Sequence, residues 1–354
     1  MRIAVVTTWL PTKRSPSVGS FIARDIAALG AEHDLRVLHL AADAGEEILE
    51  LPGASQTRSF PFDLRTPGGW IRSRRIVRAA MRGVDVVHTM AAPALLAIGP
   101  GGASVPWVHT EHWSGVVRAA HAPAVDPKRL LMRTLMRRPD IVVAVSDYLG
   151  SAVESFRRQR VPVVGNIVDV PPLAGQRAPF AGGQIKVLGV GTVAAHKGWS
   201  LAVDTIETLR AQGNDASLTW LGDGPELELM RRCASRVPLA APGHVAPEEV
   251  REAMRSADVL ILPTLRETFS LVTAEALASG TPVVATGRGG HQGLITAETG
   301  VIVARDREAL AQGVLQALQF DRQRILARGR ELVDNFSEVR FRTAYAEIYE
   351  RLRR

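Results

Sequence analysis

The 354-residue chain is poor in cysteine, in aromatic residues and in long apolar runs. Its single cysteine, Cys233, excludes an internal disulfide framework and any multi-cysteine zinc or iron–sulfur site. No stretch approaches the ~20 consecutive apolar residues that a membrane-spanning helix needs. The N-terminus leads into an apolar run without a small-residue cleavage site, so no signal peptide is expected. These absences predict a soluble, cytoplasmic protein.

Lysine and closely spaced acids are also scarce. Only four of the 43 basic residues are lysines, and no Asp-x-Asp sequence occurs. No group of His, Asp and Glu residues has metal-ligand spacing, so neither a metal nor another resident cofactor is expected. A pI of about 10.2 suggests a nucleic-acid-binding protein, but an aromatic fraction of 5% and the lack of a groove-reading motif disfavour that class.

The positive charge is unevenly distributed. Residues 1–165 hold 21 Lys and Arg against 14 Asp and Glu, while residues 166–354 hold 22 of each. The N-terminal half therefore carries the whole net charge of +7, which favours contact of that half with phosphate or with an anionic membrane surface.

The segment 70–84 gathers much of this charge on one face of a predicted helix. At 100° per residue, its apolar side carries Trp70, Ile76, Val77, Ala80, Met81 and Val84. Its other side carries Arg72, Arg74, Arg75, Arg78 and Arg82. Two interpretations stay open: a core-packed helix with a solvated basic back, or a face for anionic lipid or a phosphorylated acceptor carrier. The second would hold the protein at the inner face of a membrane, with roughly 1 kcal/mol from each base.

Short β-branched runs alternate with helical patterns along the chain. In the N-terminal half the runs are 2–8, 35–40, 84–88, 105–109 and 141–145. In the C-terminal half they are 186–190, 217–221, 259–262, 282–285 and 300–303. This alternation predicts an α/β protein whose parallel sheets are covered by helices on both faces.

A Pro- and Gly-rich stretch separates the two halves. We expect an N-terminal domain over 1–170, a linker over 171–184 and a C-terminal domain over 185–336. A C-terminal helix over 337–354 is expected to pack back on the N-terminal domain. Two doubly wound domains of this kind place a cleft between them, where the carboxyl ends of the strands open.

The segment 265–292, LRETFSLVTAEALASGTPVVATGRGGHQ, is the richest in candidate site residues. Thr268 or Ser270 is a predicted N-cap for a helix that follows a strand. The N–H groups at such a helix start favour an anion. Glu267 precedes this helix and Glu275 lies inside it, with seven residues between them.

This Glu-x7-Glu arrangement resembles the signature of retaining glycosyltransferases of family 4, which have the GT-B fold. Further segments follow the family's order: SVGSFIARDIAAL (17–29), HTEHWSG (109–115), AVSDYL (144–149), VVGNIVD (163–169), GVGTVAAHKG (189–198), WLGDGPE (220–226) and GHVAPEEVREAMRSADVLILPT (243–264). The resemblance covers nearly the full chain. It implies two Rossmann-like domains, of which the C-terminal one binds a nucleotide sugar and the N-terminal one lies on the acceptor side. It also implies metal-independent transfer of a hexose-type sugar to a hydroxyl of a glycan, a glycolipid or a small molecule.

The resemblance assigns roles to residues of the C-terminal half. Glu267 is expected to contact the donor sugar near its reacting carbon, and Glu275 to bind the ribose hydroxyls. Lys197 is expected to bind the diphosphate of the leaving nucleotide. Thr192 stands after Gly191, where many relatives have an arginine, so one cationic partner is missing. The remaining expected donor-binding residues open the predicted helix: Phe269, Ser270 and Leu271.

Two residues of the N-terminal half complete the expected site. Gly19 resembles the glycine that lets the backbone approach the donor phosphate, since it has no Cβ. His112 matches the family's histidine near the donor sugar and the acceptor, with His109 and Glu111 as neighbours on the same predicted loop. The sequence leaves open whether His112 donates a hydrogen bond or acts as a base.

Other enzyme classes remain alternatives. A nucleotide-sugar epimerase, or another GT-B enzyme, would use the same scaffold. A phosphorylase is disfavoured, because no lysine follows Lys197 to hold pyridoxal phosphate. His291 and Gln292 follow the twin glycine where relatives have a nearby acid, so the donor sugar cannot be assigned by analogy.

Overall fold

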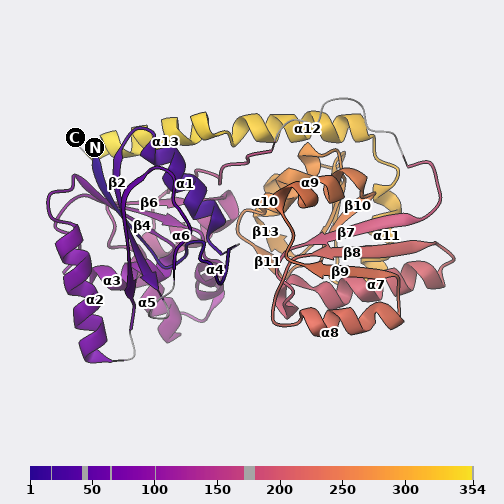
Figure 1. Cartoon of the computed structure of the whole chain (residues 1–354), viewed down its shortest axis with the longest axis horizontal. Coiled ribbons are helices and arrows are strands. Elements are labelled where there is room, and N and C mark those ends of the chain that lie inside the picture. The colour runs from indigo at the N-terminus through magenta and orange to yellow at the C-terminus, as the bar shows by residue number, and fades with distance from the viewer. Residues whose placement is uncertain (17, 42–46, 64–65, 100, 171–179, 353–354) are drawn as a thin grey trace. The chain divides into compact units, whose positions relative to one another are not determined.

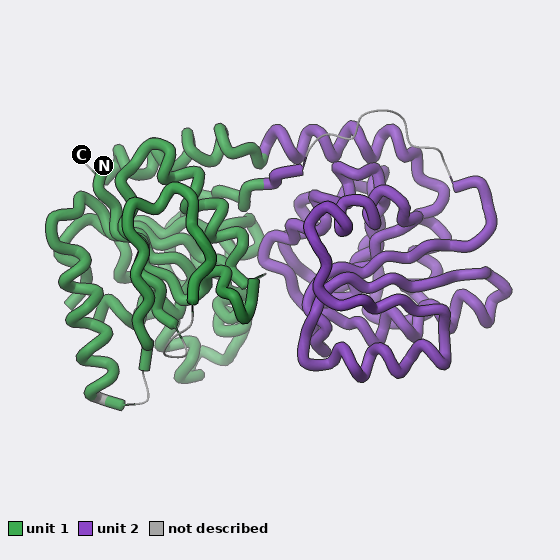
Figure 2. Tube along the Cα trace, viewed as in Figure 1, with its two compact units in different colours: residues 1–167, 336–354 green, residues 168–335 purple. Residues whose placement is uncertain are grey.

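The computed structural model describes residues 1–16, 18–41, 47–63, 66–99, 101–170 and 180–352. The chain divides into two compact units (Figure 2). Unit 1 comprises Met1–Ile167 and Phe336–Arg354, and unit 2 comprises Val168–Asn335. Most of the expected linker, residues 171–179, lies outside the described residues. Within the described ranges, no helix is both long and apolar enough to cross a bilayer.

Unit 1 is built on a six-stranded parallel sheet in the order β3-β2-β1-β4-β5-β6 (Figure 1). Its strands are β1 Arg2–Thr7, β2 Asp34–Ala41, β3 Ala54–Pro61, β4 Val86–Met90, β5 Trp107–Glu111 and β6 Ile141–Ala144. Its helices are α1 Ser20–Gly30, α2 Pro67–Ala80, α3 Leu95–Ile98, α4 Ser114–His121, α5 Pro127–Met136, α6 Asp147–Arg157 and α13 Glu338–Arg351.

Unit 2 contains a second six-stranded parallel sheet, in the order β14-β12-β10-β7-β8-β9. Its strands are β7 Ile185–Val190, β8 Ala216–Leu221, β9 Leu239–Gly243, β10 Val259–Leu262, β12 Val283–Thr286 and β14 Gly300–Val303. A separate two-stranded ladder joins β11 Arg266–Glu267 to β13 Arg288–Gly289. Its helices are α7 Trp199–Ala211, α8 Leu227–Arg232, α9 Pro247–Ser256, α10 Leu271–Ala278, α11 Arg307–Ala317 and α12 Arg322–Asn335.

The two sheets share one topology. When the strands are numbered within each unit, both orders become 3-2-1-4-5-6, the doubly wound order of dinucleotide-binding folds. The topological switch point, where the strand order reverses, lies between β1 and β4 in unit 1 and between β7 and β10 in unit 2. Ligands of such sheets bind outside the carboxyl ends of these strands. The predicted pair of Rossmann-like α/β units is confirmed.

The C-terminal helix α13 belongs to the core of unit 1, where it lies beside α1 (Figure 1). Its buried side chains recur every three or four residues: Phe341, Tyr345, Ile348 and Tyr349. They pack among apolar residues of β1 and α1, and Tyr349 Oη lies 2.8 Å from Nδ1 of the buried His88. The C-terminal segment that follows α12 therefore packs in the core of unit 1.

Helix α2 presents a narrower basic face than its sequence predicts. Val77 is buried, whereas Arg72, Arg75, Arg78 and Arg82 are exposed. Arg74, which is expected on the same face, is half-buried, and its guanidinium lies 4.5 Å from the centre of the Trp70 ring. A Cβ added at Gly99 would meet this guanidinium at 2.0 Å, so Arg74 lies against the backbone that follows α3.

Candidate functional site

Two loops of unit 2 meet at the carboxyl edge of its sheet. After β7 the chain passes Gly191 and enters the 3-10 turn η2, Ala195–Lys197. After the neighbouring strand β10 it passes Pro263 and reaches Glu267 in β11. The loops approach closely at Gly198, where an added Cβ would lie 2.1 Å from the carbonyl oxygen of Pro263. Gly198 also has a φ of +77°, a conformation that favours glycine.

The structure brings Lys197 and Glu267 together. Nζ of Lys197 donates to Oε1 of Glu267 at 2.5 Å, and the two side chains are 23% and 12% exposed. This ammonium–carboxylate pair supplies a cation for phosphate oxygens and an acceptor for sugar hydroxyls. Both groups keep some access to solvent, as a binding site requires.

Helix α10 begins at Leu271, four residues after Glu267. Its N-cap is Ser270, in a left-handed conformation with φ 78° and ψ 69° that costs an ordinary residue roughly 1–2 kcal/mol. The predicted capping by the Ser270 side chain is wrong, because its hydroxyl lies 2.8 Å from that of Thr273 and accepts from no backbone amide of the helix. The first amides of α10 therefore receive no capping oxygen from Ser270, which suits a helix start that binds an anion.

The other expected donor-binding residues lie around this helix start. Phe269 is buried beneath it, and Leu271 and Glu275 are half-buried on α10. Thr192 is exposed in the loop that follows β7. Lys197 and Glu267 thus form the charged centre of the site, and Glu275 lies about one helical turn into α10.

The twin glycine packs against the segment that carries Glu267. Gly289 pairs with Glu267 in the β11–β13 ladder, and a Cβ at Gly290 would lie 2.3 Å from the carbonyl oxygen of Thr268. His291 is fully buried, and neither of its ring nitrogens makes a hydrogen bond of full geometry among the described residues. Burial lowers the pKa of His291, while the charge of Glu267 and a weaker hydrogen bond with the Gly287 backbone oppose that shift.

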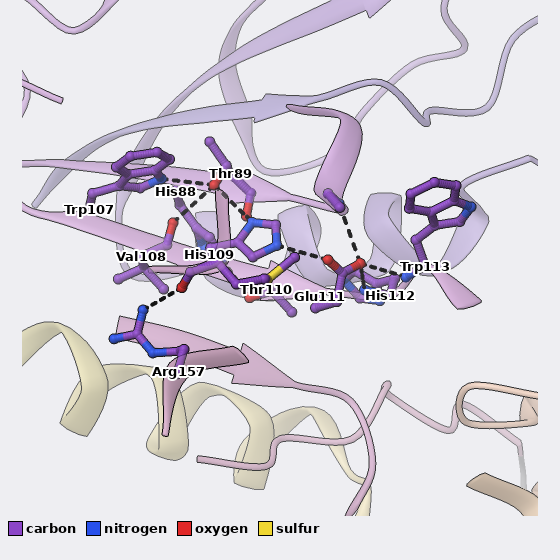
Figure 3. Close-up of polar contacts among 12 residues, drawn as sticks. His88, Thr89, Trp107, Val108, His109, Thr110, Glu111, His112, Trp113 and Arg157 are labelled. Carbon is purple, nitrogen blue, oxygen red and sulfur yellow. Dashed lines mark hydrogen bonds and ion pairs between the residues drawn. The ribbon is translucent and has the colours of Figure 1, made fainter. Parts of the chain in front are cut away.

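In unit 1, a buried carboxylate fixes the turn that carries His112 (Figure 3). Oε1 of Glu111 accepts from the backbone N–H groups of Ala92, His112 and Trp113 at 3.3, 2.9 and 2.6 Å. Oε2 of Glu111 lies 3.1 Å from Nε2 of His109. His109 and Glu111 are buried residues of strand β5, so the prediction that they lie on a loop is wrong; only His112 follows the strand.

The His112 ring is enclosed by helix α1. It lies 4.9 Å from the Phe21 ring, and its Nε2 is 3.8 Å from Oδ2 of Asp25. Burial, with a contribution from His109, lowers the pKa of His112 to about 3, against an opposing effect of Asn166. Burial raises the pKa of Asp25 well above its usual value. Sequence reasoning missed Asp25 and Asn166, although an acid among the apolar residues of a helix was a detectable signal.

Gly19 precedes α1 with a φ of +70°. An added Cβ would lie 2.6 Å from the carbonyl carbon of Trp9, so a larger residue would push the end of the β1 loop away from α1. Glycine is required here by the chain's own backbone. In the part of the chain that the structure describes, no three His, Cys, Asp or Glu residues are grouped so that they could hold a metal ion.

Comparison with known proteins agrees with this architecture. Residues 21–170 match the family described as "Glycosyltransferase Family 4", and residues 184–319 match "Glycosyl transferases group 1". The solved structure of Anabaena Alr3699/HepE in complex with UDP and glucose has a TM-score of 0.74 and 17% identity, and the similarity covers 99% of each chain.

Two curated relatives are glycosyltransferases. Sulfoquinovosyl transferase SQD2 of Arabidopsis thaliana is 27% identical over 68% of this chain and 50% of its own length. A GDP-mannose-dependent alpha-(1-6)-phosphatidylinositol dimannoside mannosyltransferase of Mycobacterium tuberculosis is 32% identical over 37% of this chain and 35% of its own length. The chain thus matches half or less of each relative's length. With both family matches in order on two doubly wound units, the chain belongs to glycosyltransferase family 4, whose members have the GT-B fold.

Proposed function

We propose that this protein is a retaining glycosyltransferase that moves a hexose-type sugar from a nucleoside diphosphate sugar to an acceptor hydroxyl without a metal ion. The observation that carries the proposal is the Lys197–Glu267 pair, with Glu267 four residues before the first residue of α10, a helix start that the Ser270 side chain does not cap. Family membership supports the reaction class, and the GDP-mannose named for one relative supports an activated nucleotide sugar as donor.

Unit 2 is the proposed donor-binding unit. The ammonium of Lys197 and the first amides of α10 would neutralise the diphosphate, which lowers the barrier to its departure. The carboxylate of Glu267 would accept hydrogen bonds from sugar hydroxyls near the reacting carbon, and that of Glu275 from the two ribose hydroxyls. Lys197 also holds Glu267 in place before the donor arrives.

The proposed reaction retains the anomeric configuration by attack on the same face. The bond between the anomeric carbon and the β-phosphate oxygen breaks, and its electron pair leaves with the nucleoside diphosphate. The acceptor oxygen bonds to the anomeric carbon, and its proton passes to the departing phosphate oxygen. Unit 1 would supply the acceptor side, with His112 contacting the sugar or the acceptor.

Thermal unfolding with UDP, GDP, ADP and dTDP tests the donor site, because a ligand of the folded state alone raises the midpoint. We expect one diphosphate to stabilise the wild type, Glu275→Ala to lose that shift, and Glu267→Ala to keep it with lower turnover. Glu331→Ala, on the outside of α12, is the control. Normal activity in both site variants would refute the assignment, and sugar isomerisation without acceptor would indicate an epimerase.

We also propose that the exposed face of α2 binds an anionic membrane or a phosphorylated acceptor carrier. Its four exposed arginines would each contribute about 1 kcal/mol near an anionic surface. Replacing these four by Gln should weaken salt-sensitive binding to anionic vesicles at least tenfold. Controls are four exposed arginines elsewhere: Arg232, Arg255, Arg307 and Arg340. Equal partitioning into neutral and anionic vesicles would refute the proposal.

A further inference from the structure

His112 and two buried polar side chains beside it, Asp25 and Asn166, carry polar atoms without a well-formed hydrogen bond among the described residues. Asp25, His112 and Asn166 are 1%, 4% and 6% exposed. Oδ1 of Asp25 has no partner among the described residues, and the ring nitrogens of His112 and Oδ1 of Asn166 make no hydrogen bond of full geometry there, although a weaker side-chain hydrogen bond from His112 to Asn166 raises the pKa of His112. Leaving one such group unpaired typically costs about 1–3 kcal/mol, and most buried polar atoms in proteins avoid it. Their occurrence around one imidazole therefore calls for a functional explanation.

One face of α1 places an aromatic ring and a carboxyl group against the imidazole of His112. Phe21 and Asp25 are four residues apart and so lie on the same side of the helix. The Phe21 ring packs against the His112 ring, and Oδ2 of Asp25 lies 3.8 Å from Nε2. A shift of less than 1 Å would turn this contact into a hydrogen bond. Glu111 meanwhile fixes the backbone N–H of His112, and the His112 ring itself is buried.

Burial disfavours the charged forms of both partners. Burial raises the pKa of Asp25, and the positive charge of Arg24 opposes this. Burial and His109 lower the pKa of His112. Two tyrosines of α13, Tyr345 and Tyr349, also interact electrostatically with Asp25, and burial raises the pKa of both, so they remain neutral phenols. Burial therefore acts in the same direction on both partners, against the carboxylate of Asp25 and against the imidazolium of His112.

We propose that Asp25 is a positioning residue whose carboxylic acid donates its O–H to Nε2 of His112 and thereby fixes the tautomer that carries its proton on Nδ1. A hydrogen bond at one ring nitrogen determines the protonation of the other. His112 then presents an Nδ1–H donor, and it serves the sugar substrate as a hydrogen-bond donor rather than as a base. This use of the donor rests on the proposed function, whereas the tautomer does not.

Two-bond ¹H–¹⁵N spectra of the histidine side chains in the full-length protein at pH 7 test the tautomer. We expect His112 to be the Nδ1–H tautomer in the wild type. Asp25→Asn keeps an N–H donor toward Nε2 and should keep that tautomer, whereas Asp25→Leu should lose it. An Nε2–H tautomer in the wild type would overturn the proposal, even if Asp25→Leu fails to fold. An unchanged tautomer in a folded Asp25→Leu variant would overturn it as well.

Kinetics separate this inference from the proposed function. Asp25→Leu should lower kcat at least tenfold with less than a threefold change in KM for the donor, and Asp25→Asn should recover most of the loss. If the spectra agree with the prediction but His112→Ala keeps normal turnover, the role of His112 in the reaction is wrong while Asp25 still positions it.

Discussion

Replacing Glu267 by Gln separates two effects of the Lys197–Glu267 pair. Because Nζ of Lys197 donates to Oε1 of Glu267 at 2.5 Å, an arriving diphosphate must draw the lysine away from the carboxylate. Glutamine keeps the shape of the side chain and removes its charge. Releasing an ion pair that retains partial solvent access frees about 0.4–1 kcal/mol for the diphosphate. The Kd for the nucleoside diphosphate should therefore fall about two- to fivefold, although turnover should fall at least tenfold.

Isothermal titration calorimetry with the diphosphate identified by thermal shift measures this effect. Lys197→Gln should act oppositely and raise Kd about 10- to 150-fold, since a hydrogen bond to a charged group contributes about 1.5–3 kcal/mol. Glu331→Gln, which removes an exposed ion pair with Arg328 on α12, serves as the control and should leave Kd unchanged. The reasoning is refuted if Glu267→Gln weakens diphosphate binding tenfold or more.

Three further outcomes follow from individual residues. Glu275→Ala should raise the Kd of the nucleoside diphosphate about tenfold or more, through the loss of charge-assisted hydrogen bonds; calorimetry with an unchanged Kd would contradict its role. Gly290→Ala should lower kcat at least tenfold, because the added Cβ would displace Thr268 next to Glu267. Gly293→Ala is the control and should keep the wild-type kcat, because a Cβ there meets no atom within 4 Å. Equal kcat values in the two variants would contradict the prediction. Burial lowers the pKa of His88 to about 3, so below pH 6.5 the unfolded chain binds a proton at His88 that the folded chain does not. The free energy of unfolding therefore falls from pH 6.5 toward pH 3 by up to about 1.4 kcal/mol per pH unit. Thermal midpoints at pH 7, 6 and 5 should fall less steeply in His88→Gln than in the wild type, and an unchanged slope would contradict this prediction.

The parts of the fold that the sequence predicts are those where burial dictates the pattern. The fully buried parallel strand β10 reads as an apolar run and is predicted to the residue. The bounds of the edge strand β14 are predicted as well, because it too is an apolar run although Ile302 is exposed. Strand β3 was missed because it is an edge strand whose residues ASQTRSFP are mostly exposed and show no apolar run. Strand β9 was missed because its sequence LAAPG is short and contains proline.

The candidate site also contains residues that the sequence predicts and residues that it does not. Lys197 and Glu267 could be proposed because the segments that contain them, GVGTVAAHKG and the Glu-x7-Glu segment, resemble motifs of the family. The left-handed backbone of Ser270 and the stacking of Arg74 on Trp70 could not, because both depend on tertiary contacts. Asp25 and Asn166 were missed because they approach His112 from segments about 90 and 50 residues away in the chain, and no local pattern encodes that meeting.

A crystal structure of the protein with its nucleoside diphosphate tests the central claim most directly. We predict that the phosphates lie within hydrogen-bond distance of the backbone amides of Leu271 and Val272 and of Nζ of Lys197, with the ribose hydroxyls on Glu275. Phosphates bound away from the start of α10, with the Lys197–Glu267 pair still closed, would contradict the account.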